Sequence, residues 1–284
     1  MTGDAPSGMS CQRKAHKGEQ ALCERSEIFY RTKALETFLF DAANFRAMNR
    51  IPSGSKILDK MLDGGYDPDI ISTVYGPAGS GKTIIALLCA IKIAKEKKVI
   101  YVDTEGSFSV ERLKQVCGSI NYDYNKILKN IAFLRPTSFQ EQMKSFEKLK
   151  DIVTDKVGLI IVDTIGMLYR LELGTSEDIY NVNRELGRQI AYLTEISRKK
   201  HIPVLITNQV YADFEDKEKV NIVGGDLLKY GSKCLIELQI TPSGNRRAIL
   251  RKHRSLSEER EISFKIVEGG IIGVKDSRGF RLFS

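Results

Sequence analysis

Eight consecutive residues of this chain have the types and the spacing that bind a phosphate group. They follow the pattern G-x-x-x-x-G-K-[ST] and are Gly76, Pro77, Ala78, Gly79, Ser80, Gly81, Lys82 and Thr83. The glycines let the backbone turn its N–H groups toward an anion, and a helix that begins at such a loop adds a favourable dipole. In this pattern the lysine contacts the β- and γ-phosphates, and the threonine hydroxyl binds Mg²⁺. The sequence therefore predicts a site for ATP and Mg²⁺.

A site of this kind also needs a carboxylate near Mg²⁺, a group that activates water and a group that senses the γ-phosphate. Asp163 ends the most apolar run of the chain and is the candidate magnesium carboxylate, with a water molecule between it and the metal. Its alternative role is to cap the following turn. Glu105 is the candidate for polarising the attacking water, and Gln209 is the candidate sensor. Asp103 competes with Glu105, and a purely structural role for both acids is the alternative.

The elements that must position these residues follow a regular order. Strand-like apolar runs and helical periodicity alternate along the chain, which predicts a parallel sheet covered on both faces. The predicted strands are 70–75, 98–103, 131–134, 157–163 and 203–208, and the predicted helices are 82–97, 109–118, 138–153 and 179–200. Each candidate site residue follows the end of a predicted strand, and this is the edge where open α/β sheets bind ligands.

Beyond residue 232 the pattern changes. Four short runs at 233–240, 246–252, 260–267 and 270–274 are joined by turn residues, which predicts antiparallel hairpins. The expected fold class is therefore α/β, with a mostly parallel central sheet flanked by helices and a C-terminal antiparallel extension.

Composition limits the possible settings of this core. The chain has 284 residues, 42% of them hydrophobic, and a net charge of +8, which favours a polyanionic partner. Its five cysteines form no C-x-x-C pair, so neither a zinc site nor a disulfide framework is indicated. No apolar stretch has membrane-spanning length and the N-terminus lacks a signal-peptide pattern. These features predict a cytoplasmic protein without a membrane partner.

The first 47 residues differ from the rest. Their composition predicts an extension that is disordered or weakly helical, and Met48 offers an alternative start of translation directly before the core. In that case residues 1–47 would carry no function. Residues 48–284 are predicted to form the ATPase core.

The motifs taken together resemble a known superfamily. The phosphate loop, Asp-Thr-Glu-Gly at 103–106, the apolar run that ends at Asp163, and Thr-Asn-Gln at 207–209 resemble the RecA-fold recombinases. Residues 51–59 and 224–230 extend this resemblance over residues 50–275. The short length and the run 251–255 look most like the archaeal RadB branch, which is paralogous to the strand-exchange protein RadA. The resemblance implies a RecA-like P-loop ATPase core in which Lys82, Glu105 and Gln209 are catalytic.

The resemblance also implies contacts with DNA. Family recombinases carry two DNA-binding loops, which correspond here to residues 170–183 and 210–223. The second contains more acidic than basic residues, although phosphate binding needs cations, and Tyr211 and Phe214 offer stacking on bases. The helix-hairpin-helix domain of RadA-type recombinases has no counterpart in residues 1–50. These departures imply a protein that binds ATP and DNA without efficient strand exchange.

A basic cluster in the C-terminal part offers another surface. It comprises Arg246, Arg247, Arg251, Lys252, His253 and Arg254. Residues 251–254 are predicted to contact DNA, or to reach the ATP of a neighbouring subunit, because Lys252 and Arg254 match two cations with that role in RecA-type filaments. The alternative is a solvated hairpin edge that charge protects from aggregation.

The leading hypothesis is an accessory factor in homologous recombination and DNA repair that hydrolyses ATP weakly. The implied partners are single-stranded or branched DNA, a RadA-type recombinase, a Holliday-junction resolvase and further copies of the chain. Residues 40–43, Phe-Asp-Ala-Ala, match loosely the F-x-x-A segment that docks into a neighbouring core. The alternatives are a catalytic strand-exchange recombinase and a KaiC-like regulatory ATPase without a role on DNA.

Overall fold

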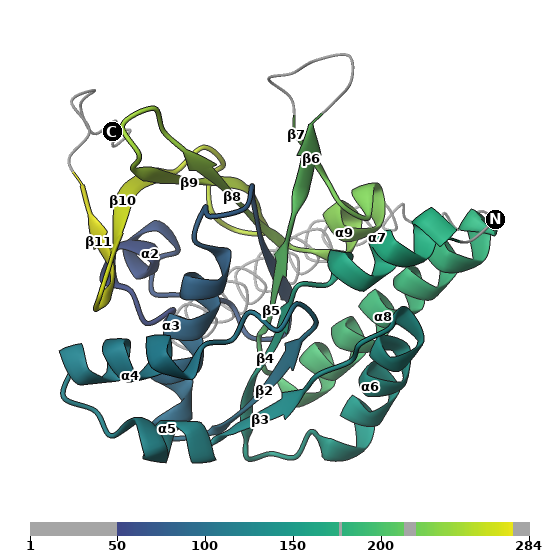
Figure 1. Ribbon diagram of the computed structural model, residues 1–284, viewed down its shortest axis with the longest axis horizontal. Helices are drawn as coiled ribbons and strands as arrows, with labels where there is room; N and C mark the ends of the chain where they lie inside the picture. Colours follow the sequence, from purple (N-terminus) through teal and green to yellow (C-terminus); the bar gives the residue numbers. More distant parts are fainter. Residues whose placement is uncertain (1–49, 176–177, 213–219, 275–284) are drawn as a thin grey trace, which may run out of the picture. The chain divides into compact units, whose positions relative to one another are not determined.

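The structure is a computed structural model that describes residues 50–175, 178–212 and 220–274. Within these residues helices and strands alternate in the predicted order (Figure 1). The helices are α2 (Lys56–Met61), α3 (Lys82–Ala94), α4 (Val110–Ser119), α5 (Tyr124–Lys129), α6 (Phe139–Ile152), α7 (Gly166–Thr175), α8 (Ile179–Lys200) and α9 (Gly225–Gly231). The strands are β1 (Ile71–Tyr75), β2 (Lys98–Asp103), β3 (Ile131–Leu134), β4 (Val157–Asp163), β5 (Val204–Asn208), β6 (Val210–Ala212), β7 (Val220–Ile222), β8 (Cys234–Ile240), β9 (Arg246–His253), β10 (Glu261–Val267) and β11 (Gly270–Gly273).

One large sheet organises the described residues. Its strand order is β11-β10-β9-β8-β1-β5-β4-β2-β3. The strands from β8 to β3 pair in parallel, and β8, β9, β10 and β11 pair antiparallel. The predicted fold class is therefore confirmed, including the antiparallel extension. Strands β6 and β7 form a separate ribbon that projects from this sheet (Figure 1).

Two apolar layers cover the sheet, one on each face. Along β2, Val99 and Tyr101 face the layer formed by α2, α3, α4 and α5, whereas Ile100 and Val102 face the layer of α6, α7, α8 and α9. Figure 1 shows α3, α4 and α5 on one side and α6 and α8 on the other. Strand β4 is buried along its whole length, as expected of a parallel strand covered on both faces. The sheet therefore holds its carboxyl edge on a rigid support.

The structure corrects one expectation and adds elements that the sequence did not predict. Residues 170–183 were expected to form a DNA-binding loop, but α7 extends to Thr175 and α8 begins at Ile179. The helices hold these residues because Leu168 and Tyr169 of α7 and Val182 of α8 are buried in the second apolar layer. The short helices α2, α5 and α9 were also not predicted.

Several expectations concern residues outside the described ranges. These are the N-terminal extension of residues 1–47, the segment 40–43, and the stacking role of Phe214. The domain boundary at residue 48 stays a prediction for the same reason. Within the described ranges, no helix is both long enough and apolar enough to cross a membrane.

Candidate nucleotide site and the neighbouring pocket

The predicted phosphate loop joins β1 to α3 at the carboxyl edge of the sheet. Gly79 and Gly81 have φ angles of +73° and +105°, in the left-handed region that favours glycine. Gly81 is also the N-cap of α3 and has no side chain that could bond the first N–H groups of the helix. These N–H groups are therefore available to an anion. The hydroxyl of Ser80 is buried and has no hydrogen-bond partner among the described residues. The loop thus fits a phosphate chain.

Lys82 is the first residue of α3, and its amine turns back onto the loop. Nζ donates to the carbonyl oxygens of Gly76 at 2.9 Å and Pro77 at 2.8 Å. Burial lowers the pKa of Lys82, and the nearby charges of Glu105 and Asp163 partly offset this shift. The amine therefore already lies over the loop, where a phosphate would replace the carbonyl oxygens with a stronger, charge-assisted acceptor. Thr83 follows in the same helical turn and is partly exposed.

Asp163 is fully buried at the end of β4 and is oriented by hydroxyl groups from neighbouring segments. Its Oδ2 accepts hydrogen bonds from Tyr101 at 2.7 Å and Ser107 at 3.0 Å, and its Oδ1 accepts one from Thr207. Burial, and then the Asp163 charge, raise the pKa of Tyr101, so this tyrosine stays a neutral donor. Three hydroxyls leave the carboxylate little capacity for direct metal contact. This geometry fits the predicted magnesium contact through water.

Glu105 and Gln209 lie far apart in the sequence but contact each other in the structure. Gln209 Nε2 donates to Glu105 Oε1 at 2.8 Å, and Thr164 Oγ1 donates to the same oxygen at 2.8 Å. Thr104 Oγ1 in turn accepts the backbone N–H of Thr164 at 2.9 Å. The candidate base and the candidate sensor are therefore brought together where β2, β4 and β5 end.

Asp103, the competitor of Glu105, has other partners. Its two carboxylate oxygens accept the backbone N–H groups of Ser107 at 3.0 Å and Phe108 at 3.4 Å. Its side chain therefore holds the turn that follows β2. This turn carries Ser107 to Asp163, so Asp103 supports the site indirectly.

Most cations of the segment 251–254 have partners inside the chain. Arg251 pairs with Glu237 at 2.6 Å. Lys252 Nζ donates to the carbonyl oxygens of Lys229 and Ser232, at 2.6 and 2.9 Å. Those carbonyls lie at the C-terminal end of α9, where a cation stabilises the helix.

Arg254 and His253 belong to a buried charge network. Arg254 bonds Asp67 at 2.8 Å and Asp69 at 3.0 Å, and Arg50 pairs with Asp67 at 2.8 Å. The side chain of His253 is 1% exposed and that of Asp67 is 2% exposed. The predicted contact of residues 251–254 with DNA or with a neighbour's ATP stays a prediction. Any such contact has to compete with these internal partners.

The residues of the basic cluster from Arg246 to Arg254 are spread along strand β9 and directly after it, from one edge of the sheet to the other. Strand β9 separates Arg246 from His253 by seven residues, which corresponds to roughly 23 Å of extended chain. Arg246 lies beside the phosphate loop, where its Nη2 donates to the Gly79 carbonyl at 3.3 Å. His253 pairs with Cys234 at the start of β8, at the opposite edge of the sheet.

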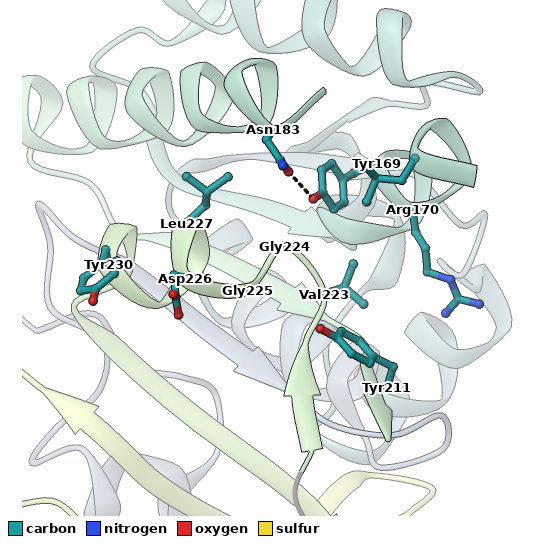
Figure 2. Close-up of a pocket in the computed structure, with 11 residues that line it drawn as sticks. Tyr169, Arg170, Asn183, Tyr211, Val223, Gly224, Gly225, Asp226, Leu227 and Tyr230 are labelled. Carbon is teal, nitrogen blue, oxygen red and sulfur yellow. Dashed lines mark hydrogen bonds between the residues drawn. The ribbon is translucent and has the colours of Figure 1, made fainter. Parts of the chain in front are cut away.

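A pocket of about 600 Å³ lies beside the nucleotide site, between α7, α8, α9 and the β6–β7 ribbon. Its lining surface is mainly apolar and includes three tyrosines, and Figure 2 shows the side chains around it. The hydroxyl of Tyr169 donates to Asn183 Oδ1 at 2.6 Å, so this pair is fixed in the wall. Tyr211 and Tyr230 are 47% and 75% exposed and offer ring faces to a ligand. The charged lining residues are Arg170 and Asp226.

Asn208 connects the pocket with the nucleotide site. This fully buried side chain donates to the Val223 carbonyl at 2.6 Å and accepts the backbone N–H of Gln209 at 3.0 Å. The Val223 N–H donates to the Gln209 carbonyl at 3.2 Å. A movement of Gln209 would therefore act directly on Val223, which lines the pocket.

Sequence reasoning placed the main site residues but missed those that orient them. Thr104, Thr207 and Asn208 lie within the motifs 103–106 and 207–209, and Thr164 directly follows Asp163. Their position next to buried strand ends was the available signal. Tyr101 and Ser107 gave no such signal, because hydroxyls within and just after an apolar strand have many other uses.

The fold and the nucleotide site together define the structural class of this protein. A phosphate-binding loop after β1, with Glu105, Asp163 and Gln209 at the ends of neighbouring parallel strands, is the RecA-like arrangement that the motifs implied. The family model described as Rad51 matches residues 45–274. The chain belongs to the Rad51 family and, within it, to the RadB group, as the following relatives show.

The protein of Methanobrevibacter smithii named DNA repair and recombination protein RadB is 41% identical over 81% of this chain and 98% of its own length. The protein of the same name from Methanococcoides burtonii is 40% identical over 77% of this chain and 96% of its own length. A solved structure described as the crystal structure of the RadB recombinase has a TM-score of 0.69 and 37% identity. It covers 79% of this chain and 99% of the solved chain. The resemblance to RadB inferred from the motifs is confirmed.

Proposed function

We propose that this chain binds ATP with Mg²⁺ at the carboxyl edge of the sheet, hydrolyses it slowly and binds DNA at the neighbouring pocket. It acts as an accessory factor of a RadA-type recombinase in homologous recombination and DNA repair. The names of its RadB relatives support the setting in repair and recombination.

The observation that carries the proposal is the contact of Glu105 with Gln209. When bound, ATP would supply the phosphoryl group, and Mg²⁺ would supply positive charge that balances the phosphate oxygens. Lys82 and the first N–H groups of α3 would bind the phosphates, Thr83 would hold the metal directly, and Asp163 would hold it through a water molecule. Glu105 orients the attacking water and accepts its proton. Gln209 shares Glu105 Oε1 with Thr164, so any shift of Gln209 toward a phosphate changes the support of the base.

The pocket supports DNA binding of modest strength. Tyr211 and Tyr230 offer ring faces, and stacking on a base contributes about 1–3 kcal/mol. Arg170 is the cation of the described lining and is balanced by Asp226. Phosphate contacts provide most non-specific affinity, so this pocket alone favours a short stretch of single-stranded or branched DNA. Weak DNA affinity at this position suits an accessory factor better than a recombinase that forms its own filaments.

The remaining parts of the proposal concern partners and setting. A RadA-type recombinase is the main protein partner, with a Holliday-junction resolvase and further copies of the chain as additional ones. The cytoplasm is the proposed compartment. The family of the chain and the absence of a membrane-spanning helix from the described residues are consistent with this setting.

The test is ATP turnover of the purified protein with and without single-stranded DNA, together with DNA binding measured by fluorescence anisotropy. An accessory factor binds DNA, turns over ATP slowly and responds little to DNA. Strong stimulation together with filaments would replace this proposal with a strand-exchange recombinase. Slow turnover with no DNA binding would favour a regulatory ATPase.

A pair of variants locates DNA at the pocket. Tyr211→Ala removes an exposed ring that lines the pocket, and Tyr180→Ala removes an exposed ring outside it. The first variant is expected to weaken DNA binding about 5- to 100-fold, which corresponds to the loss of one stacked base. The second is expected to bind as the unaltered protein does. Equal DNA affinity of the two variants would show that the pocket is not the site of DNA binding.

A further inference from the structure

A group of lysines gathers at the amino ends of β2, β3 and β4, on the edge of the sheet opposite the phosphate loop. We call it the lysine edge, and it consists of Lys95, Lys97, Lys98, Lys129 and Lys156. Lys98 Nζ donates to the Lys129 carbonyl at 2.9 Å, and the backbone N–H of Lys98 donates to the Lys156 carbonyl at 2.8 Å. These bonds place three of the five residues side by side.

The other two lysines adjoin the same place. A Cβ atom built on Gly158, near the start of β4, would lie 2.6 Å from Lys97 Cδ, so the stem of Lys97 packs across that strand. Lys95 Nζ lies 3.4 Å from the centre of the Tyr122 ring. All five are exposed except Lys95, which is partly exposed.

The positive charge of the lysine edge is not balanced by ion pairs within the described residues. Within the described part of the chain, none of its five ammonium groups forms an ion pair with a carboxylate. Two acids are direct sequence neighbours of these lysines, Glu96 and Asp155. Asp155 pairs with Lys200 at 3.3 Å. Arg251 and Arg254, by contrast, pair with buried or half-buried acids.

We propose that the lysine edge binds the phosphate backbone of duplex DNA and does so whether or not nucleotide is bound. This inference rests on the proposed function insofar as the chain acts on DNA, but it assigns a second surface, on the sheet edge away from the pocket. Neighbouring strands lie about 4.8 Å apart, so the amino ends of β3, β2 and β4 span roughly 10 Å. Duplex DNA carries about one charge per 1.7 Å of its axis, so about six phosphate charges lie along that length.

The composition of the lysine edge favours nucleic acid over a protein partner. Protein interfaces are depleted in lysine and have an apolar or aromatic core. Here lysine predominates, and the Tyr122 ring at its margin lies under the Lys95 ammonium group. A lysine at a helix C-terminus also stabilises the helix, which accounts in part for Lys95 at the end of α3, for Lys129 at the end of α5, and for Lys98, whose Nζ bonds the last carbonyl of α5. It does not account for Lys97 and Lys156, which precede the starts of β2 and β4.

The test compares two triple variants of the full chain. Lys97→Gln, Lys129→Gln and Lys156→Gln together remove three charges from the lysine edge. Lys144→Gln, Lys148→Gln and Lys265→Gln remove three exposed charges from α6 and β10. Thermal unfolding first establishes that both variants fold. Affinity for a duplex oligonucleotide is then measured by anisotropy over a series of salt concentrations, with and without Mg²⁺ and ATP.

The lysine-edge variant is expected to reduce the slope of log affinity against log salt by about two to three units, with or without ATP. The control variant keeps the slope of the unaltered protein. Equal slopes in the two variants overturn the inference but leave the proposed function intact if Tyr211→Ala still weakens binding of single-stranded DNA. An unaltered protein that binds no DNA overturns both. A lysine-edge variant that loses binding to polyglutamate while its DNA slope is unchanged assigns the surface to an acidic protein and also overturns the inference.

Discussion

The charged side chains at the two edges of the sheet have different kinds of partner. At the carboxyl edge, Glu105, Asp163 and Gln209 come from different strands, and neutral or amide donors hold their side chains beside an anion-binding loop. At the amino edge, Arg254 bonds Asp67 within the protein. Abundant charge at a strand end therefore does not by itself indicate a binding site. What differs is the partner: an internal partner of opposite charge, as Arg254 has in Asp67, competes with a ligand more strongly than the neutral partners at the carboxyl edge do.

Lys82 offers the most drastic way to break this comparison. Lys82→Ala removes the ammonium group that lies over the phosphate loop. ATP binding, measured by calorimetry, is expected to fall below detection, and turnover is expected to disappear. Arg254→Ala, at the opposite edge, is the control and keeps ATP affinity in dilute protein. Normal ATP affinity in Lys82→Ala would show that the nucleotide does not bind at the carboxyl edge.

Glu105→Gln sharpens the comparison within the carboxyl edge. The amide keeps the shape of the side chain but cannot accept a proton from water, so turnover is expected to fall about 10²-fold or more with ATP affinity retained. Asp103→Asn should act mainly on stability, because Asp103 accepts backbone N–H groups of the following turn. Rapid turnover in Glu105→Gln combined with its loss in Asp103→Asn would reverse the two roles.

Asp67 tests the structural role of the charges at the amino edge. Asp67→Asn leaves Arg50 and Arg254 without their buried carboxylate, so the free energy of unfolding is expected to fall by about 2 kcal/mol. Asp155→Asn removes an acid that is 96% exposed and paired with Lys200, and it should change that free energy by less than about 0.5 kcal/mol. Denaturant titrations compare the two variants. A smaller loss in Asp67→Asn than in Asp155→Asn contradicts a structural network.

His253 gives the smallest expected effect, seen as a dependence on pH. Burial lowers the pKa of His253, the Asp67 charge partly offsets this shift, and the cations of Arg50, Arg254 and Arg260 add to it. The unfolded chain therefore binds a proton near the ordinary pKa of about 6.5, and the folded chain binds it only at lower pH. Stability is thus present above about pH 6.5 and is lost as pH falls toward the folded pKa.

The neutral ring has a structural reason as well. His253 Nδ1 accepts the backbone N–H groups of Ser255 and Leu256, both at 3.2 Å, and a protonated ring cannot accept them. Chemical unfolding at several pH values between about 5 and 7 should therefore show a steeper loss in the unaltered protein than in His253→Asn. Parallel curves for the two proteins would show that another group causes the dependence.

The sequence allowed the strands and the chemistry of the carboxyl edge to be predicted, because both depend on local patterns. The apolar run 157–163 became β4, which ends at Asp163, and Glu105 lies just beyond the end of β2. The partners of the amino-edge cations could not be predicted. Arg254 finds Asp67 and Asp69 almost 190 residues away, and no spacing rule connects them. The helix α7 was missed because its burial depends on packing against α6 and α8.

Amide hydrogen exchange with and without Mg²⁺ and ATP tests the central claim most directly, because it reads both edges of the sheet in one experiment. In dilute protein, nucleotide is expected to slow exchange in residues 76–83 and in the segments around Glu105, Asp163 and Gln209. Exchange in residues 251–256 is expected to stay unchanged. Protection of residues 251–256 in dilute protein, or unchanged exchange in residues 76–83, would contradict the assignment of the nucleotide to the carboxyl edge.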